Sequence, residues 1–158
     1  MSKTREKFML EAIKMAETGM NSGKGGPFGA IVVKHGKIIG RGNNQVTTSN
    51  DPTAHAEVVA IRDACKNINS FQLEDCEIYT SCEPCPMCLG AIYWARPKAV
   101  YYAGDKKDAA DAGFDDDFIY QEIATPVNAR KIPMKQLLQD KAQLVFKAWI
   151  DKDDKIEY

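Results

Sequence analysis

The sequence predicts a single three-layer α/β/α sandwich with a mixed central sheet. The chain has 158 residues, close to the length of about 150 residues that typically makes one domain. Two short strand-like runs lie near the start, separated by a two-residue turn, which is typical of a hairpin. Helix-like and strand-like segments then alternate, which favours helices on both faces of a sheet. We therefore expect one domain over residues 1–158.

The first third of the chain predicts a helix followed by a hairpin. Apolar residues between Thr4 and Asn21 recur at spacings of three and four, as on one face of a helix. The glycine-rich run at 22–27 ends this helix. Two strand-like runs follow, Phe28–Lys34 and Lys37–Gly42, and His35-Gly36 between them suits a tight turn.

The remaining segments supply the other layers. Asp51-Pro52 predicts a helix start, with Asp as N-cap and Pro in the first turn, and this helix runs to about Lys66. The later patterns predict strands over Cys76–Thr80 and Ala99–Ala103, and a possible last strand over Ile132–Leu137. They also predict a helix opened by a proline over Pro84–Ala95 and a closing helix over Asp140–Asp151.

Charge and hydropathy narrow the function classes. The 21 basic and 22 acidic residues nearly cancel, so the chain lacks the basic excess that binding to a phosphate backbone usually needs. A small-molecule partner is therefore favoured over a nucleic acid. The longest apolar stretch, Phe28 to Val33, is too short to span a bilayer, and the polar N-terminus lacks a secretory pattern. We expect a cytoplasmic protein with no membrane partner.

Five cysteines are the first chemical signal. Cys82, Cys85 and Cys88 lie within seven residues, and such a cluster without a secretion signal indicates metal binding or catalysis rather than disulfides. We expect Cys65 and Cys76 to be small buried hydrophobic residues that bind no metal.

Two predicted helix starts carry the metal-binding pattern. His55 and Glu57 are two residues apart on one helix, and Cys85 and Cys88 share a face of another. Two helix N-termini could thus present imidazole and two thiolates, the ligands that zinc prefers. Three protein ligands leave a fourth position for a water molecule, which zinc can acidify into a nucleophile. Glu57 could then accept a proton from that water and pass it to a substrate.

Other readings of the same residues remain open. Cys82 could join the other three ligands in a closed structural zinc site without an open position. An iron–sulfur cluster is disfavoured, because no fourth cysteine follows Cys88 at the required spacing. Glu57 could also be an ordinary solvated carboxylate, since Glu is common in first helical turns.

The motifs resemble a known superfamily. His-x-Glu followed by Pro-Cys-x-x-Cys is the signature of zinc nucleobase deaminases, and residues 51–57 and 81–88 contain both halves. These segments resemble the cytidine deaminase superfamily, whose fold is the α/β/α sandwich predicted above. Residues 26–30, 90–95 and 112–116 further resemble bacterial guanine deaminases of that superfamily, and the similarity covers nearly the whole chain.

The resemblance implies hydrolysis of guanine to xanthine and ammonia. It implies one zinc ion per chain held by His55, Cys85 and Cys88, with Glu57 as the proton shuttle. The substrate-binding roles that it implies are ring stacking by Phe28, a purine-edge contact by Asn44 with both a donor and an acceptor, a contact by Ala56, a bond to the leaving amino group by Asp116, and pocket closure by Trp94 and Tyr158. Pattern alone would instead make Phe28 and Trp94 core aromatics, Asn44 a turn cap and Asp116 a solvated charge.

The resemblance also suggests a homodimer. In it, the C-terminal segment of about residues 140–158 crosses between subunits and Tyr158 covers the neighbouring pocket; the alternative is a frayed terminus. Two other functions remain, a tRNA adenosine deaminase with the same zinc core and a non-enzymatic zinc-stabilised module. A basic surface would favour the first, and a closed metal site would favour the second.

Overall fold

The structure, a computed structural model, describes residues 3–158, which divide into two compact units: one up to Asp116 and one over Asp117–Tyr158. The first unit contains a four-stranded sheet with its helices, and the second contains helices and extended chain. Among the described helices, none combines the length and apolar character needed to cross a membrane. The extent of the domain, 1–158, stays a prediction.

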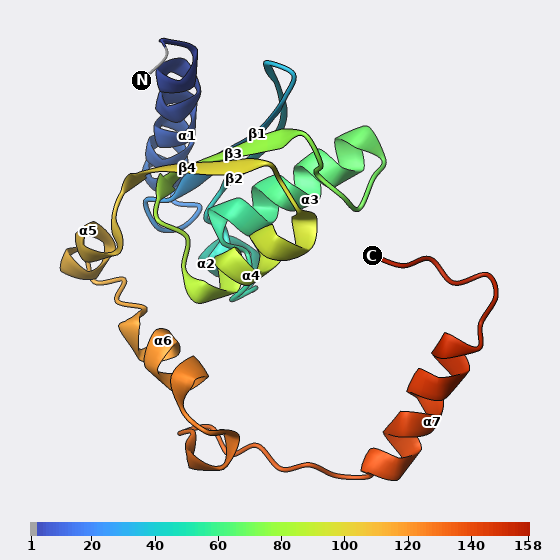
Figure 1. Ribbon diagram of the computed structural model, residues 1–158. Helices are drawn as coiled ribbons and strands as arrows, with labels where there is room; N and C mark the ends of the chain where they lie inside the picture. The colour runs from blue at the N-terminus through green and yellow to red at the C-terminus, as the bar shows by residue number, and fades with distance from the viewer. Residues whose placement is uncertain (1–2) are drawn as a thin grey trace. The chain divides into compact units, whose positions relative to one another are not determined.

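The sheet is mixed, as predicted (Figure 1). Its strands are β1 (Gly29–Lys34), β2 (Lys37–Asn43), β3 (Cys76–Cys82) and β4 (Ala99–Gly104), in the order β2-β1-β3-β4. β1 pairs antiparallel with both β2 and β3, whereas β3 and β4 are parallel. His35 and Gly36 both have positive φ, 48° and 75°, the backbone that a two-residue hairpin turn requires.

Helices cover both faces of this sheet (Figure 1). α1 (Lys3–Asn21) packs on one face, and α3 (Ala56–Ile68) and α4 (Pro86–Ala95) lie side by side on the other. Along β1, Ile31 and Val33 join the core under α1, while Ala30 and Val32 join the core under α3. This burial on both faces explains the continuous apolar run of β1 and confirms the three-layer prediction.

Glycines on β2 let α3 approach the sheet at backbone distance. A Cβ on Gly42 would lie 2.2 Å from the carbonyl oxygen of Ala56, and one on Gly40 would lie 2.5 Å from that of Ala60. Real Cβ atoms do not approach that closely, so both positions need glycine. Because Ala56 is the first residue of α3, Gly42 sets where this helix begins relative to the sheet.

The predicted start of this helix was wrong. α3 begins at Ala56 with His55 as N-cap, whereas Asp51 stabilises a separate turn by accepting hydrogen bonds from Thr53 N at 2.8 Å and Thr53 Oγ1 at 2.7 Å. A short helix that the sequence did not indicate, α2 (Val46–Ser49), precedes this turn. Similarly, α4 begins at Pro86 rather than at Pro84.

The predicted strand at Ile132–Leu137 was also wrong. Residues 133–138 have no regular structure, and the second unit contains no strand among its described residues with which they could pair. The closing helix is confirmed as α7 (Gln139–Ile150). Besides α2, two further helices were not predicted, α5 (Lys106–Asp111) in the first unit and α6 (Asp117–Ala124) in the second. A 3₁₀ turn at Val127–Ala129 follows α6.

Candidate active site

Two helix N-termini on the same face of the sheet form the centre of the site. His55 is the N-cap of α3 and Cys85 is the N-cap of α4. Both have extended backbone, and neither side chain makes a capping hydrogen bond. Their side chains are therefore free of the usual N-cap role, and the packing of α3 against α4 brings them together.

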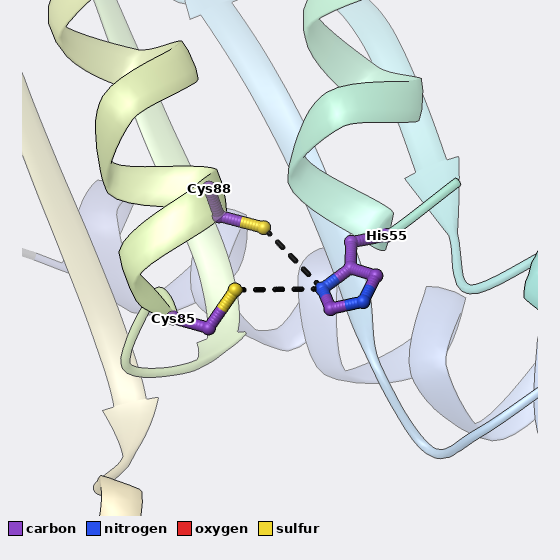
Figure 2. Close-up of side chains that lie close together, drawn as sticks. All are labelled: His55, Cys85 and Cys88. Atoms are coloured by element: carbon purple, nitrogen blue, oxygen red, sulfur yellow. Dashed lines mark hydrogen bonds between the residues drawn. The ribbon is translucent and has the colours of Figure 1, made fainter. Parts of the chain in front are cut away.

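His55, Cys85 and Cys88 converge on one point (Figure 2). The Nδ1 atom of His55 lies 3.6 Å from the sulfur of Cys85 and 3.5 Å from that of Cys88. The three candidate ligand atoms all lie within 4.8 Å of one another. One imidazole nitrogen and two sulfurs are a donor set typical of zinc, so these residues fit the predicted ion.

The two thiols have pKa values shifted in opposite directions. A hydrogen bond with Cys88, together with the nearby His55, lowers the pKa of Cys85 to about 4. The same bond and burial raise the pKa of Cys88. The bond to Cys85 raises the pKa of His55. Cys85 is therefore favoured as a thiolate, the form that binds a metal ion, and binding of a divalent cation would displace the protons of the other two residues.

Cys82 lies outside this cluster. Its thiol is buried and donates to the carbonyl oxygen of Asp105 at 3.5 Å. Burial raises its pKa to about 11, which opposes the thiolate form that a ligand needs. The geometry favours a site with three protein ligands over a closed site with four.

Glu57 is not a solvated helix carboxylate. Its side chain is only 6% exposed, and burial raises its pKa. Its Oε1 accepts from the Thr80 hydroxyl at 3.1 Å, and its Oε2 accepts from the Cys88 thiol at 3.4 Å. A buried carboxylate beside the ligand cluster is suitably placed for proton transfer.

A cavity of about 110 Å³ opens next to the cluster. The residues that line it all belong to the first unit: Phe28, Asn44, His55, Glu57, Cys82, Glu83, Cys85, Lys106, Ala109, Phe114 and Asp116. The structure thus brings Phe28, Asn44 and Asp116 together with the candidate metal ligands. Burial raises the pKa of Asp116, with a further contribution from the charge of Cys85.

Phe114 is a cavity residue that sequence reasoning missed. Its ring meets that of Phe28 edge to face, with centroids 4.9 Å apart and an interplanar angle of 86°. The two rings form one aromatic wall, in a geometry that aromatic pairs prefer. Glu83 and Lys106 were missed as well, and the backbone N–H of Lys106 donates to Glu83 Oε2 at 3.2 Å.

Asn44 differs from the expectation that its amide offers both a donor and an acceptor. Its Oδ1 accepts from the backbone N–H groups of Gly26 at 3.3 Å and Val46 at 3.2 Å. Those two bonds use both lone pairs of the carbonyl oxygen, which leaves the NH₂ group for a ligand. A Cβ on Gly25 would lie 2.3 Å from this oxygen, closer than real Cβ atoms approach, so Gly25 is required for the arrangement.

Three residues named by the resemblance do not line this cavity. Ala56 is fully buried at the start of α3. Trp94 on α4 and Tyr158 in the second unit are 63% and 68% exposed. The predicted contacts of these residues with substrate stay predictions.

Comparison with known proteins places the chain among deaminases. Residues 2–104 match the model of the cytidine and deoxycytidylate deaminase zinc-binding region. The chain is 60% identical to guanine deaminase of Bacillus subtilis over 97% of its own length and 98% of that protein. It is 43% identical to the tRNA-specific adenosine deaminase of Aquifex aeolicus, over 65% of its own length and 68% of that protein.

A solved structure extends this similarity to the fold. The X-ray structure of guanine deaminase from Bacillus subtilis superposes with a TM-score of 0.95 at 58% identity, and the match covers 100% of this chain and 99% of that one. The similarity therefore includes both the sheet and the segment that follows it.

Proposed function

The chain belongs to the family of cytidine and deoxycytidylate deaminases, and from that premise we propose that it is a zinc-dependent hydrolase that converts guanine to xanthine and ammonia. Guanine is chosen as the substrate because of how much of the chain each relative matches. A guanine deaminase matches 97% of the chain, whereas the tRNA-specific relative matches 65%. The segment beyond the zinc-binding region is thus shared with a guanine deaminase.

The three convergent residues would hold the zinc ion. His55 contributes Nδ1, and Cys85 and Cys88 contribute their sulfurs. Zinc held there would supply a Lewis acid that lowers the pKa of the attacking water molecule. The low pKa of Cys85 favours the thiolate form that a ligand must adopt.

Glu57 moves the proton. It accepts a proton from the attacking water and returns it to the substrate as the amino group leaves. In the overall reaction a C–O bond forms at the ring carbon, the C–N bond to the amino group breaks, and ammonia departs. No redox partner is needed. The burial of Glu57, which raises its pKa, brings the carboxyl group nearer to the proton affinity that such a shuttle needs.

The cavity walls would recognise the base. Phe28 and Phe114 offer aromatic surface to the purine ring. The Asn44 amide donates to a purine acceptor, and Asp116 accepts from the exocyclic amino group. The cavity of about 110 Å³ is small beside the ~300–1,000 Å³ typical of sites for larger ligands, so a free base suits it.

A tRNA adenosine deaminase is the second candidate, favoured by the 43% identity to the Aquifex aeolicus protein. The net charge of −1 gives a polynucleotide little to bind. A purely structural zinc module is disfavoured, because the ligand cluster borders a cavity rather than a closed core.

We also propose a cytoplasmic homodimer in which each chain forms one domain, residues 1–158, and exchanges its segment of about 140–158 with its partner. The apolar side chains of α7 support a second copy as the partner, because they are 42–70% exposed: Leu144, Val145, Phe146, Trp149 and Ile150. Exchange would also bring the Tyr158 of one copy near the cavity of the other. The five described cysteines are free thiols, which suits a reducing compartment.

Ammonia release from a panel of free bases, nucleosides and a tRNA anticodon stem-loop tests the proposal. We expect the highest kcat/KM for guanine. A higher value for cytidine or the stem-loop would overturn the choice of substrate while leaving deaminase chemistry intact.

The variant Glu57→Gln tests the proton shuttle. It should keep its zinc and fold but lose about 10²–10⁴-fold in kcat, since an amide cannot carry the proton. Near wild-type kcat in that variant would remove Glu57 from the mechanism.

A further inference from the structure

A buried hydroxyl lies beneath the proton-transfer carboxylate. Thr80 is on β3 in the interior of the sheet, opposite Ala30 of β1 and Tyr102 of β4, and is only 1% exposed. Its Oγ1 donates to Glu57 Oε1 at 3.1 Å. This hydrogen bond connects the sheet directly to the first turn of α3.

The two oxygens of Glu57 have different neighbours. Oε1 faces the Thr80 hydroxyl, whereas Oε2 faces the Cys88 sulfur at 3.4 Å and therefore lies on the side of the ligand cluster. A cysteine that binds zinc is a thiolate and has no proton to donate. With zinc in place, Thr80 is then the side chain in the described part of the chain that still donates a hydrogen bond to this carboxylate.

We propose that Thr80 is a positioning residue that anchors Oε1 of Glu57 and so leaves Oε2 to carry the proton between water and guanine. The inference rests on the proposed deaminase function. It requires no additional group, because the proton that Oε2 takes from water is the proton that it gives to the base.

Thr80 is well suited to this task for two reasons. Its backbone is paired on both sides within the sheet, and its β-branched side chain restricts χ1, so the hydroxyl is held at a fixed place. Glu57, by contrast, has several rotatable bonds. Fixing one oxygen restricts the rotamer of the carboxylate and places the other in reach of the reacting atoms, which is the advantage of a preorganised site.

Three variants test this role. Thr80→Val is nearly isosteric and removes the donor, and Thr80→Ser keeps it. Ser81→Ala is the matched control, because Ser81 is the next hydroxyl on β3 and accepts from Gly29 N at 3.0 Å without touching Glu57. We expect Thr80→Val to bind zinc normally and to lose about 10–100-fold in kcat per bound zinc, with little change in KM. Thr80→Ser should restore most of the kcat, and Ser81→Ala should change stability more than kcat.

Coupling to Glu57 separates positioning from general stability. Because Thr80 acts through Glu57, Thr80→Val should have no further effect on kcat in the Glu57→Gln background. Crystal structures of the zinc-loaded proteins give a readout independent of turnover: the Glu57 carboxylate should have one rotamer in the wild type and more than one in Thr80→Val. If Thr80→Val does not fold, Thr80→Ala takes its place in each comparison.

The outcomes distinguish the two proposals. A wild-type enzyme that releases no ammonia from guanine would overturn the proposed substrate, and the Thr80 comparison would then be made on whichever amino-substituted ring it does hydrolyse. Equal kcat for wild type and Thr80→Val on that substrate, or equal losses in Thr80→Val and Thr80→Ser, would overturn the role of Thr80. An ordered, unchanged Glu57 rotamer in Thr80→Val would do the same.

Discussion

The orientation of the Asn44 carboxamide determines which hydrogen bonds the cavity can offer. Because Oδ1 is held by Gly26 and Val46, the NH₂ group is the part of this side chain that remains to bond a ligand. Asn44→Asp keeps the accepting oxygen but replaces the donor with a second, charged acceptor. We expect kcat/KM for guanine to fall about 10–100-fold, the equivalent of roughly 1–3 kcal/mol for a lost hydrogen bond.

Asn44→Ala provides the comparison. It removes both functions of the amide, so it should weaken guanine binding and also leave the N–H groups of Gly26 and Val46 without their partner. We therefore expect its melting temperature to fall in addition to its kcat/KM. Unchanged kcat/KM in Asn44→Asp would mean that the NH₂ group does not contact the substrate.

The cysteines differ in their predicted contribution to zinc binding. Cys85→Ser should lose zinc, because it removes a ligand with a strongly lowered pKa. Cys82→Ser should retain zinc, because the thiol of Cys82 donates to Asp105 outside the cluster. Metal analysis of the purified variants measures both. Equal loss of zinc in the two would indicate a closed site with four ligands and would contradict the enzyme assignment.

The residues that sequence could identify are those whose chemistry depends on spacing along one helix. His55 with Glu57 and Cys85 with Cys88 each lie within one helical turn, so their convergence could be expected. Phe114 and the orientation of Asn44 could not, because they depend on contacts between segments far apart in sequence: Phe114 with Phe28, and Asn44 with Gly26. Thr80 gave no signal, since a threonine in a strand is ordinary.

At the level of elements, the close approach of β2 to α3 positions the first metal ligand. Gly42→Ala would place a methyl group against the carbonyl of Ala56, next to His55. We expect it to destabilise the fold by about 1–3 kcal/mol, as overpacking does, and to weaken zinc binding because the N-cap of α3 must move. Thermal unfolding and competition with a chelator measure the two effects.

Gly40→Ala is the matched control for this prediction. Its methyl group would meet Ala60 and Ala64, further along the same helix. We expect a similar loss of stability with a smaller change in zinc affinity. An equal change in zinc affinity for both variants would show that the metal site responds to general destabilisation rather than to the position of His55.

Element boundaries were predictable only where local and tertiary signals agreed. Asp51-Pro52 satisfies the local rule for a helix start. The Asp51 carboxylate, however, accepts hydrogen bonds from Thr53 in a turn, and the helix begins only after the N-cap His55. The helix α5 carried a detectable signal, a capping box between Asp105 and Asp108. Its six residues contain too few apolar side chains for periodicity to reveal it.

At the scale of the whole molecule, the helices of the second unit expose apolar side chains. Both helices of this unit lack buried residues, although α7 contains Leu144, Val145 and Phe146. Apolar surface of this kind usually marks a binding surface. The sequence could predict α7 from its periodicity. It could not predict what covers the helix, because periodicity identifies an apolar face but not its partner.

The proposed exchange of C-terminal segments is tested with a mixed dimer in which only a site shared between two chains can be active. One subunit carries Glu57→Gln and an intact tail, and the other has an intact Glu57 but lacks residues 151–158. Each protein alone should have little activity, the first without its proton shuttle and the second without Tyr158.

In a mixed dimer with exchanged tails, one of the two sites combines Glu57 of one chain with the tail of the other. Co-expression with two different affinity tags allows this mixed dimer to be purified, and we expect about half the activity of the wild-type dimer. If each tail instead serves its own chain, both sites stay defective and no activity returns, whereas a truncated protein with full activity by itself would mean that the tail does not cover the site.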